Sequence, residues 1–348
     1  MKLYGAIDLH SNNSVVVVQD EQDRRVFRKR LPNDLGRIVS ALAVYQSELV
    51  GVVVESTYNW YWLVDGLMAA GFHIHLANTA AIKTYEGLKY TDDFDDASWL
   101  AHLLRVGLLK EGYICPQEHR VVRDLLRKRS QLVRQKTANV LSIQNLMARN
   151  TGQRLAGNAV KKLTSEAVDN LLPQAELALA VQSNVVVMAC LAEQIRRLER
   201  AVLERVKLAP AFEPLQTVSG IGRILALTIM LETGEIARFS SVGRFASYGR
   251  CVGSQRLTNG KPKGKGNVKN GNKYLAWAFV EAANFAVRYH PKIQRFYQRK
   301  KAKTNGVVAI KAVAHKLARA CYYILRDQVP FDVDRAFASR GDGLGWDR

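Results

Sequence analysis

The stretch KLYGAIDLHSNNSVVVVQDEQDRRVFRKRL, residues 2–31, decides the fold of the N-terminal part of the chain. It contains three strand-like runs, KLYGAIDL (2–9), NSVVVVQD (13–20) and RRVFRKRL (24–31), separated by a few polar residues. Connections this short allow only antiparallel hairpins, because parallel strands need a crossover of about a dozen residues. The sequence therefore predicts a three-stranded antiparallel meander at the start of the chain.

The following segments alternate between helix and strand. Apolar side chains at helical spacing predict a helix over 34–48, and the continuous apolar run LVGVVVE (49–55) predicts a strand buried on both faces. A helix over 60–70 and a strand over 72–78 follow. The order β-β-β-α-β-α-β, a meander followed by parallel crossovers, resembles the ribonuclease H-like fold, so we expect an α/β domain of that class.

Long helices are predicted for the middle of the chain. Residues 118–150 contain no Gly or Pro and place apolar side chains three and four positions apart, with basic residues between them. A second apolar seam predicts a helix over about 185–207, which we expect to pack antiparallel against the first, whereas 151–184 shows no clear pattern. We expect four segments: an α/β catalytic domain 1–117, a helical coiled-coil assembly region 118–207, a mainly α C-terminal domain 208–330 and a disordered tail 331–348.

The charge of the chain indicates a polyanionic partner. Its 348 residues include 51 Lys+Arg against 31 Asp+Glu, a formal net charge of +20. An excess of this size is typical of proteins that bind nucleic acid, although a basic surface that keeps the protein soluble is the alternative. The hydrophobic content of 48% excludes a disordered polyelectrolyte.

Compartment signals favour the cytoplasm. We find no apolar run of bilayer-spanning length, and the N-terminus lacks the apolar core of a signal peptide. Cys115, Cys190, Cys251 and Cys321 are scattered and form no CxxC pair, so we expect reduced thiols and neither a disulfide framework nor a zinc site.

Two carboxylates end neighbouring strands of the predicted sheet. Asp8 closes the first strand in GAIDLH, and Glu55 closes the buried strand in VVVEST. Both would lie at the carboxyl edge of the sheet, where open α/β sheets bind ligands. An aspartate in a hairpin turn is an ordinary alternative for Asp8. Glu55 is harder to explain this way, because a buried glutamate is costly without a cation or a basic partner.

A second group of carboxylates lies in YTDDFDDASWLA, residues 90–101, just before a predicted helix over 97–107. Capping and the helix dipole favour acids at this place, but they require only one or two. Asp93 and Asp96 are three residues apart and would share one helix face, while Asp92 and Asp95 would point elsewhere. With Asp8 and Glu55 they would form a four-carboxylate site suited to Mg²⁺ or Mn²⁺, and a pair of such ions can clamp a phosphodiester.

Two C-terminal segments are candidates for nucleic-acid binding. LQTVSGIGRILALTIMLETGEI (215–236) has the pattern of a helix-hairpin-helix clamp, although an ordinary tight turn between helices has the same pattern. CVGSQRLTNGKPKGKGNVKNGNKYLAWAFVEAA (251–283) opens with a Gly- and Lys-rich loop, which is either flexible or folds around phosphate. The predicted nucleic-acid-binding residues are Arg127, Lys128, Arg134, Lys136, Gly220, Gly222, Arg223, Arg256, Lys261, Lys263, Lys265, Lys269 and Lys273.

The loop also contains two hydroxyl groups, on Ser254 and Thr258. Either hydroxyl could attack phosphorus only if another group activates it.

The motifs IDLH, VVVEST, DFDDASWLA, LLRKRSQLVRQKTANVLSIQNLM, GIGRILALTIMLETG and NVKNGNKYLAWAFVEAA occur in the order seen in a known family. Over most of residues 3–325 the chain resembles the DEDD transposases of the insertion-sequence one-ten family, and most closely the eleven-eleven subgroup. The resemblance implies a RuvC-like N-terminal domain followed by a C-terminal transposase domain with a Gly-rich loop.

The resemblance also implies roles for particular residues. The four acids of the family correspond to Asp8, Glu55, Asp93 and Asp96, and its pattern D-x-x-D-A-x-x-L-A fits residues 93–101. In this family a serine of the C-terminal domain is the nucleophile, in a site completed by the acids of another subunit. The usual Ser-Gly pair corresponds here to Thr258-Asn259-Gly260, so we expect the nearest serine, Ser254, to be the nucleophile, with Thr258 as the alternative.

From these features we expect a transposase or recombinase that excises and inserts a mobile DNA element by Mg²⁺-dependent cleavage and rejoining. The resemblance implies guidance by a non-coding RNA that pairs with donor and target DNA. We expect a homo-oligomer, a dimer or a tetramer, in the bacterial cytoplasm near the nucleoid and not at a membrane. The alternatives are a RuvC-type nuclease or junction resolvase that uses water, and a non-catalytic RNA- or DNA-binding protein.

Overall fold

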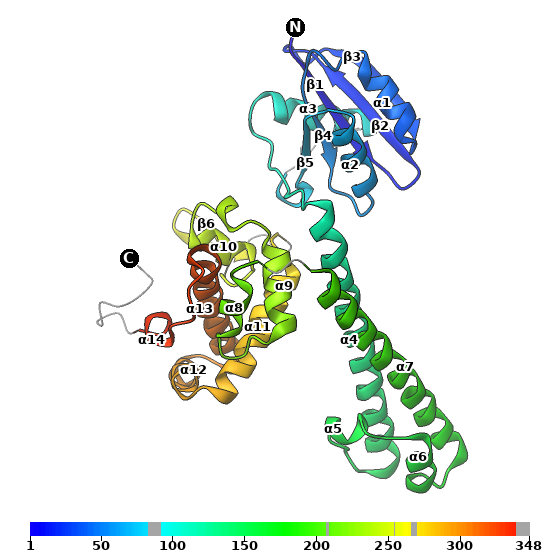
Figure 1. The fold of residues 1–348 in the computed structure, drawn as a ribbon, viewed down its shortest axis with the longest axis vertical. Helices are drawn as coiled ribbons and strands as arrows, with labels where there is room; N and C mark the ends of the chain where they lie inside the picture. The colour runs from blue at the N-terminus through cyan, green and yellow to red at the C-terminus, as the bar shows by residue number, and fades with distance from the viewer. Residues whose placement is uncertain (83–91, 207–208, 254, 266–269, 339–348) are drawn as a thin grey trace. The chain divides into compact units, whose positions relative to one another are not determined.

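A computed structural model describes residues 1–82, 92–206, 209–253, 255–265 and 270–338 (Figure 1). The chain divides into two compact units, Met1–Gln117 and Glu118–Arg348. Each unit has a hydrophobic core of its own.

The N-terminal unit is built on a five-stranded mixed sheet with the order β3-β2-β1-β4-β5. β2 pairs antiparallel with both β1 and β3, as the short connections predict, and β4 lies parallel to β1 and β5. This topology confirms the predicted ribonuclease H-like domain. The strands are β1 (Leu3–Leu9), β2 (Asn13–Gln19), β3 (Arg25–Pro32), β4 (Leu49–Glu55) and β5 (Ile74–Ala77).

Helices cover both faces of this sheet (Figure 1). α1 (Leu35–Ala43) and α2 (Tyr61–Ala69) pack on one face, in a core that contains Leu3, Ile7 and Leu9 of β1. α3 (Asp93–Arg105) packs on the other face, against Ala6 and Val53. A short 3₁₀ turn, η1 (Thr79–Ala81), follows β5. Because strand side chains alternate between faces, the residues that follow Ala6 and Val53 by two positions face α3 as well.

α3 begins earlier than the predicted 97–107 helix, because the aspartates form its first turn. Asp92 is the N-cap and accepts a hydrogen bond from the backbone N–H of Asp95, whose side chain accepts in return from the N–H of Asp92. This reciprocal capping box satisfies two backbone donors that the helix leaves unpaired. Asp92 and Asp95 thus point away from the face shared by Asp93 and Asp96, as the helical spacing predicts, and cap the helix.

The C-terminal unit begins with two long helices, α4 (Gln117–Thr151) and α7 (Ala175–Arg205). Ile143 and Met147 pack with Val185 and Met188, while the earlier Arg129 of α4 bonds the later Glu199 of α7, so the helices run antiparallel as predicted. α7 begins at Ala175, before the predicted position 185. The segment between them forms α5 (Gly157–Val160) and α6 (Ser165–Leu171), which bury Val160 and Val168 in the same cluster.

α7 differs from the expectation of no membrane-length apolar run. Among the described residues it is the one helix long and apolar enough to cross a membrane, by length and composition alone. It contributes Val181, Val185 and Met188 to a buried cluster with α4 and α6.

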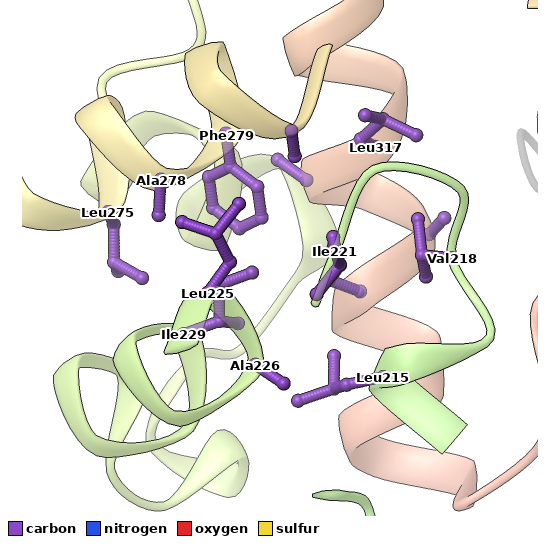
Figure 2. Packing of buried hydrophobic residues seen from close by; sticks show 14 of the residues in the cluster. Leu215, Val218, Ile221, Leu225, Ala226, Ile229, Leu275, Ala278, Phe279 and Leu317 are labelled. Atoms are coloured by element: carbon purple, nitrogen blue, oxygen red, sulfur yellow. The ribbon is translucent and has the colours of Figure 1, made fainter. Parts of the chain in front are cut away.

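The remaining residues form a helical bundle around α9 (Arg223–Thr233), which is buried on all sides from Leu225 to Thr233. Figure 2 shows Leu225 and Ile229 against Leu275, Ala278 and Phe279 of α11. A helix this apolar all round is stable only inside a core. The other elements are α8 (Phe212–Gln216), η2 (Ile236–Arg238), α10 (Val242–Tyr248), β6 (Gln255–Thr258), β7 (Lys261–Lys265), α11 (Lys273–Tyr289), α12 (Pro291–Lys303), α13 (Gly306–Asp327) and α14 (Val333–Ala336).

The expected disordered tail over 331–348 is wrong for its first part. The side chain of Asp332 caps α14, and Ala336 and Phe337 are buried in the bundle core. The backbone N–H of Phe331 donates to the hydroxyl of Thr217, 2.8 Å away. Residues 339–348 lie outside the described part of the chain.

Candidate active site

Asp8 and Glu55 lie side by side on the α3 face of the sheet. Ile7 of β1 pairs with Val54 of β4, so the next residues along the two parallel strands are Asp8 and Glu55. Asp8 is buried and Glu55 is partly buried. The predicted meeting of these two carboxylates at the carboxyl edge of the sheet therefore follows from the strand register.

The two carboxyl groups interact unfavourably when both are ionised. The pKa of Glu55 is raised to about 8, first because burial disfavours its charged form, and then because of its hydrogen bond with Asp8 and the negative charges of Asp8 and Asp96. Glu55 therefore retains its proton near neutral pH, next to the carboxyl group of Asp8. Such a pair can release its proton readily when a cation enters.

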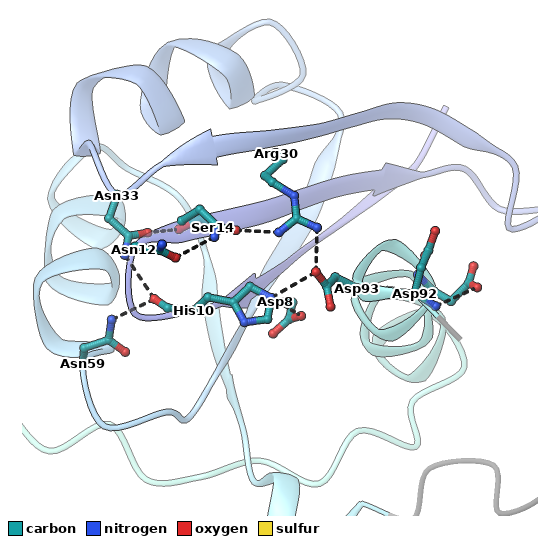
Figure 3. Close-up of polar contacts among 11 residues, drawn as sticks. Asp8, His10, Asn12, Ser14, Arg30, Asn33, Asn59, Asp92 and Asp93 are labelled. Atoms are coloured by element: carbon teal, nitrogen blue, oxygen red, sulfur yellow. Dashed lines mark hydrogen bonds and ion pairs between the residues drawn. The ribbon is translucent and has the colours of Figure 1, made fainter. Parts of the chain in front are cut away.

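The first turn of α3 brings Asp93 and Asp96 to the same place. The guanidinium of Arg30 donates to Asp93 Oδ2 over 2.6 Å and lowers the pKa of Asp93 (Figure 3). The pKa of Asp96 is raised by loss of solvent and by the charges of Asp8 and Asp93. Asp95 faces elsewhere and forms an ion pair with Arg25.

His10 joins this cluster. Its Nε2 is buried and lies 3.2 Å from Asp8 Oδ2 and 3.4 Å from Asp93 Oδ2, where a protonated imidazole would form ion pairs with both carboxylates. Its backbone carbonyl accepts hydrogen bonds from the side-chain amides of Asn33 and Asn59, each 3.1 Å long (Figure 3). These amides hold the chain in place just after β1 and so fix the imidazole against the carboxylates.

The residues present fit a divalent cation. One ligand atom each from Asp8, His10 and Asp93 lies within 4.8 Å of the others. Burial and the neighbouring negative charges raise the pKa values of Glu55 and Asp96. Carboxylate oxygens suit Mg²⁺ and Mn²⁺, and one imidazole favours the softer Mn²⁺.

Sequence reasoning missed His10 and Arg30. The Asp-x-His spacing at the end of β1 was a usable signal, because the turn after a strand can return a side chain to its edge. Arg28 and Arg30 are two apart on β3 and therefore share a face. The guanidinium of Arg28 lies 5.6 Å from the centroid of the Phe94 ring, and Arg30 binds Asp93. This face of β3 therefore contacts the first turn of α3.

The two candidate nucleophiles belong to the C-terminal unit. Ser254 lies outside the described residues. Thr258 ends β6, is exposed and pairs with Lys261 across the turn Asn259–Gly260. Asn259 and Gly260 have φ values of 50° and 70°, which is typical of a type I′ hairpin turn. The Gly- and Lys-rich segment therefore forms a β-hairpin with a hydroxyl next to its tip.

Buried polar contacts anchor the base of this hairpin. Glu232 of α9 is 3% exposed and accepts two hydrogen bonds from Arg127 of α4, 2.7 and 2.8 Å long. Glu232 also accepts from Asn272 over 2.7 Å, and the Asn272 side chain caps α11. Arg250 donates to the carbonyl of Gly271 over 2.8 Å, which joins the two ends of the hairpin segment.

The structure separates the predicted nucleic-acid-binding residues into groups. Arg127 is engaged with Glu232, and Gly220 packs so closely on α11 that a Cβ would lie 2.3 Å from the carbonyl of Ala282. Both residues therefore have structural roles. Lys136 is partly buried, and Gly222, at the start of α9, has open space around it. Lys269 lies outside the described residues, as do the side chains of Arg256 and Lys265. The exposed members of the set are Lys128, Arg134, Arg223, Lys261, Lys263 and Lys273.

Comparison with known proteins agrees with this arrangement. Residues 6–150, which contain all four acids, match the DEDD transposase domain family of IS110 elements, described as a transposase. Residues 213–298 match the family described as the transposase IS116/IS110/IS902 family. The chain belongs to the IS116/IS110/IS902 family of transposases.

Two relatives align with most of the length of this transposase. It is 27% identical over 283 residues to a probable family 20 transposase of Pseudomonas aeruginosa, a match that covers 76% of this chain and 80% of the relative. It is 25% identical over 260 residues to a protein of Sinorhizobium fredii that is named as a transposase, covering 72% of this chain and 63% of the relative. A DEDD transposase domain implies a divalent metal ion, which agrees with the donor set at Asp8, His10 and Asp93.

Proposed function

We propose that this transposase excises and inserts a mobile DNA element by cutting and rejoining DNA strands, with a protein hydroxyl as nucleophile. The main support is the gathering of carboxylates at the sheet edge, where burial and the negative charges of Asp8 and Asp96 raise the pKa of Glu55 to about 8. Asp8, Glu55, Asp93 and Asp96 are the proposed metal ligands.

The proposed chemistry is a transesterification. The hydroxyl of Ser254, or of Thr258, loses its proton, and its oxygen forms a bond to phosphorus. The bond from phosphorus to a DNA oxygen breaks, and that oxygen takes up a proton. Rejoining is the same exchange in reverse. A divalent cation, when bound, offsets the negative charge that builds on the phosphate oxygens.

The protein's own residues prepare this site. Glu55, next to Asp8, holds a proton that it would release when positive charge enters the site. Arg30 holds the carboxylate of Asp93, and the capping box of Asp92 and Asp95 fixes the turn that bears Asp93 and Asp96. Asn33 and Asn59 hold the backbone at His10.

The finer assignments rest on family resemblance. We propose guidance by a non-coding RNA, membership of the eleven-eleven subgroup, and a homo-oligomer that acts in the bacterial cytoplasm. The basic composition, with a net charge of +20, favours nucleic-acid partners for such a protein. RNA that co-purifies with the protein and maps to DNA beside the gene would support guidance, and nuclease-treated protein with full activity would refute it.

Covalent trapping on labelled DNA tests the nucleophile. We expect a protein–DNA adduct in wild-type protein, none in Asp8→Asn, and none in Ser254→Ala. An adduct that survives Ser254→Ala but not Thr258→Ala would identify Thr258. Cleavage with free ends and no adduct in any variant would instead favour a RuvC-type nuclease that uses water.

A further inference from the structure

The exposed face at the end of α11 presents two aromatic rings to solvent. Phe285 and Tyr289 lie one helical turn apart, with ring planes 8° from parallel and centroids 6.4 Å apart. Their exposed fractions are 38% and 70%. The guanidinium of Arg288 lies 5.9 Å and 6.0 Å from the two centroids. Solvent-exposed aromatic rings beside a guanidinium can stack with nucleobases.

The next helix, α12, presents positive charge. Six of its thirteen residues, PKIQRFYQRKKAK, are Lys or Arg and none is Asp or Glu. Lys292, Arg295, Arg299 and Lys303 are three or four positions apart and therefore lie on one side of the helix. Only Ile293 of this helix is buried. Among the described ion pairs, Lys292 has a carboxylate partner, Asp334, whereas Arg295, Arg299 and Lys303 have none.

The two helices are joined directly. α11 ends at Tyr289, His290 is the one residue between the helices, and Pro291 is the first residue of α12. Stacking rings and a row of cations therefore follow each other without an intervening loop. Neither helix contributed to the predicted nucleic-acid-binding set beyond Lys273, so this surface is an addition to that set.

We propose that the end of α11 and the basic side of α12 bind single-stranded nucleic acid. Phe285 and Tyr289 stack on unpaired bases, and Arg295, Arg299 and Lys303 neutralise backbone phosphates. The inference deepens the proposed function, because an enzyme that exchanges strands must hold unpaired strands. A protein partner is less well matched, since a row of cations beside open aromatic faces is complementary to phosphates and bases in alternation.

Fluorescence anisotropy tests the surface with three labelled probes, an oligothymidine, an oligouridine of the same length and a DNA duplex. Tyr289→Ala should weaken binding of single strands about tenfold, because stacking on one ring contributes about that factor. Tyr289→Leu keeps apolar volume without a flat π face and should lose nearly as much. Tyr58→Ala is the matched control, since Tyr58 is 83% exposed in the N-terminal unit and should change nothing.

Charge is tested separately from stacking. The double change Arg295→Gln and Arg299→Gln should weaken binding and reduce the slope of log affinity against log salt by about one for each phosphate that is no longer neutralised. Tyr289→Ala should leave that slope unchanged. The control is Lys161→Gln with Lys162→Gln, two exposed lysines next to α5.

Single-strand binding by Tyr289→Ala equal to wild type would overturn the proposal, and so would equal losses on the single strands and the duplex. A loss confined to oligouridine assigns the surface to RNA, and a loss confined to oligothymidine assigns it to DNA. The outcome is independent of the catalytic proposal, because Asp8→Asn should abolish strand cleavage, whereas the binding losses of Tyr289→Ala are measured without any cleavage.

Discussion

The pKa of Glu55 depends on its burial and on the charges of the neighbouring carboxylates in the site. Its pKa is raised to about 8 from the ordinary 4.5, so the folded protein holds a proton there that the unfolded chain has lost. The folded state therefore binds more protons between these values, and stability must fall as pH rises from about 4.5 to about 8. A metal ion at the site would remove this penalty.

We predict that Glu55→Gln flattens this pH dependence in metal-free protein. Glutamine cannot ionise, so the variant should gain stability relative to wild type between pH 5 and pH 9, on the order of 2 kcal/mol after allowance for partial exposure and coupling. The free energy of unfolding of the N-terminal unit is measured in urea, with a chelator present, at pH 5 and at pH 9. A difference between variant and wild type that is the same at both pH values would show that Glu55 does not retain its proton.

We predict that the imidazole of His10 is a ligand of the bound metal ion. Its Nε2 faces the carboxylates of Asp8 and Asp93, and one ligand atom from each of the three residues lies within 4.8 Å of the others, as a shared metal ion requires. Mn²⁺ bound to the wild-type protein should show nitrogen coupling from the imidazole in pulsed electron paramagnetic resonance. His10→Asn should remove the coupling and weaken Mn²⁺ binding about 10- to 100-fold.

The control for His10 is His73→Asn, a histidine of the same unit that lies near the carbonyl of Val50. If Mn²⁺ binds to wild type but shows no nitrogen coupling, His10 is not a ligand, although the metal site itself would stand. No Mn²⁺ binding at all would refute the metal site.

At the scale of elements, the contact between Glu232 of α9 and Arg127 of α4 connects the long helices to the base of the hairpin. Glu232 is 3% exposed and also bonds Asn272, so removing its charge weakens two short hydrogen bonds from Arg127 at a carboxylate that is almost fully buried, and leaves the longer 3.8 Å contact of Arg127 with Asp124. Removing one partner of a buried ion pair lowers the free energy of unfolding strongly, whereas an exposed ion pair contributes little to it.

We predict that Glu232→Gln lowers the free energy of unfolding by about 2–3 kcal/mol. The matched control is Glu199→Gln, which removes the more exposed bond to Arg129 between α4 and α7 and should lower it by less than about 1 kcal/mol. Chemical unfolding of both variants measures the difference. Equal effects would mean that the Glu232 contact is no stronger than a surface ion pair.

How far sequence predicts these elements depends on how local their causes are. β1, β2, β3 and β4 are predicted to within a residue or two, because alternation and short connections determine them. The start of α7 was missed because Gln182, Ser183 and Asn184 interrupt the apolar pattern, which α5 and α6 complete. α14 was missed because the burial of Phe337 depends on a distant core. Asp8 and Glu55 follow from strand order, whereas Arg30 and His10 depend on where α3 packs.

At the scale of the whole molecule, the proposed chemistry is divided between two units. The acids belong to Met1–Gln117, and both candidate nucleophiles belong to Glu118–Arg348. Family resemblance implies that the acids and the nucleophile of one site come from different subunits. The division of the chain into separate compact units is compatible with such sharing, and a mixture of two inactive variants can test it.

We predict that Asp8→Asn protein and protein with both Ser254→Ala and Thr258→Ala, each inactive alone, regain strand cleavage when mixed and allowed to exchange subunits. In a mixed dimer with shared sites, one site joins intact acids to an intact nucleophile, and the other has neither. An equal mixture should therefore regain roughly a quarter of the wild-type sites, since half of the dimers are mixed. If each subunit builds its own site, every site in the mixture lacks one half and no cleavage returns. The control mixes Asp8→Asn with Asp93→Asn, which damage the same half-site and should stay inactive under either arrangement.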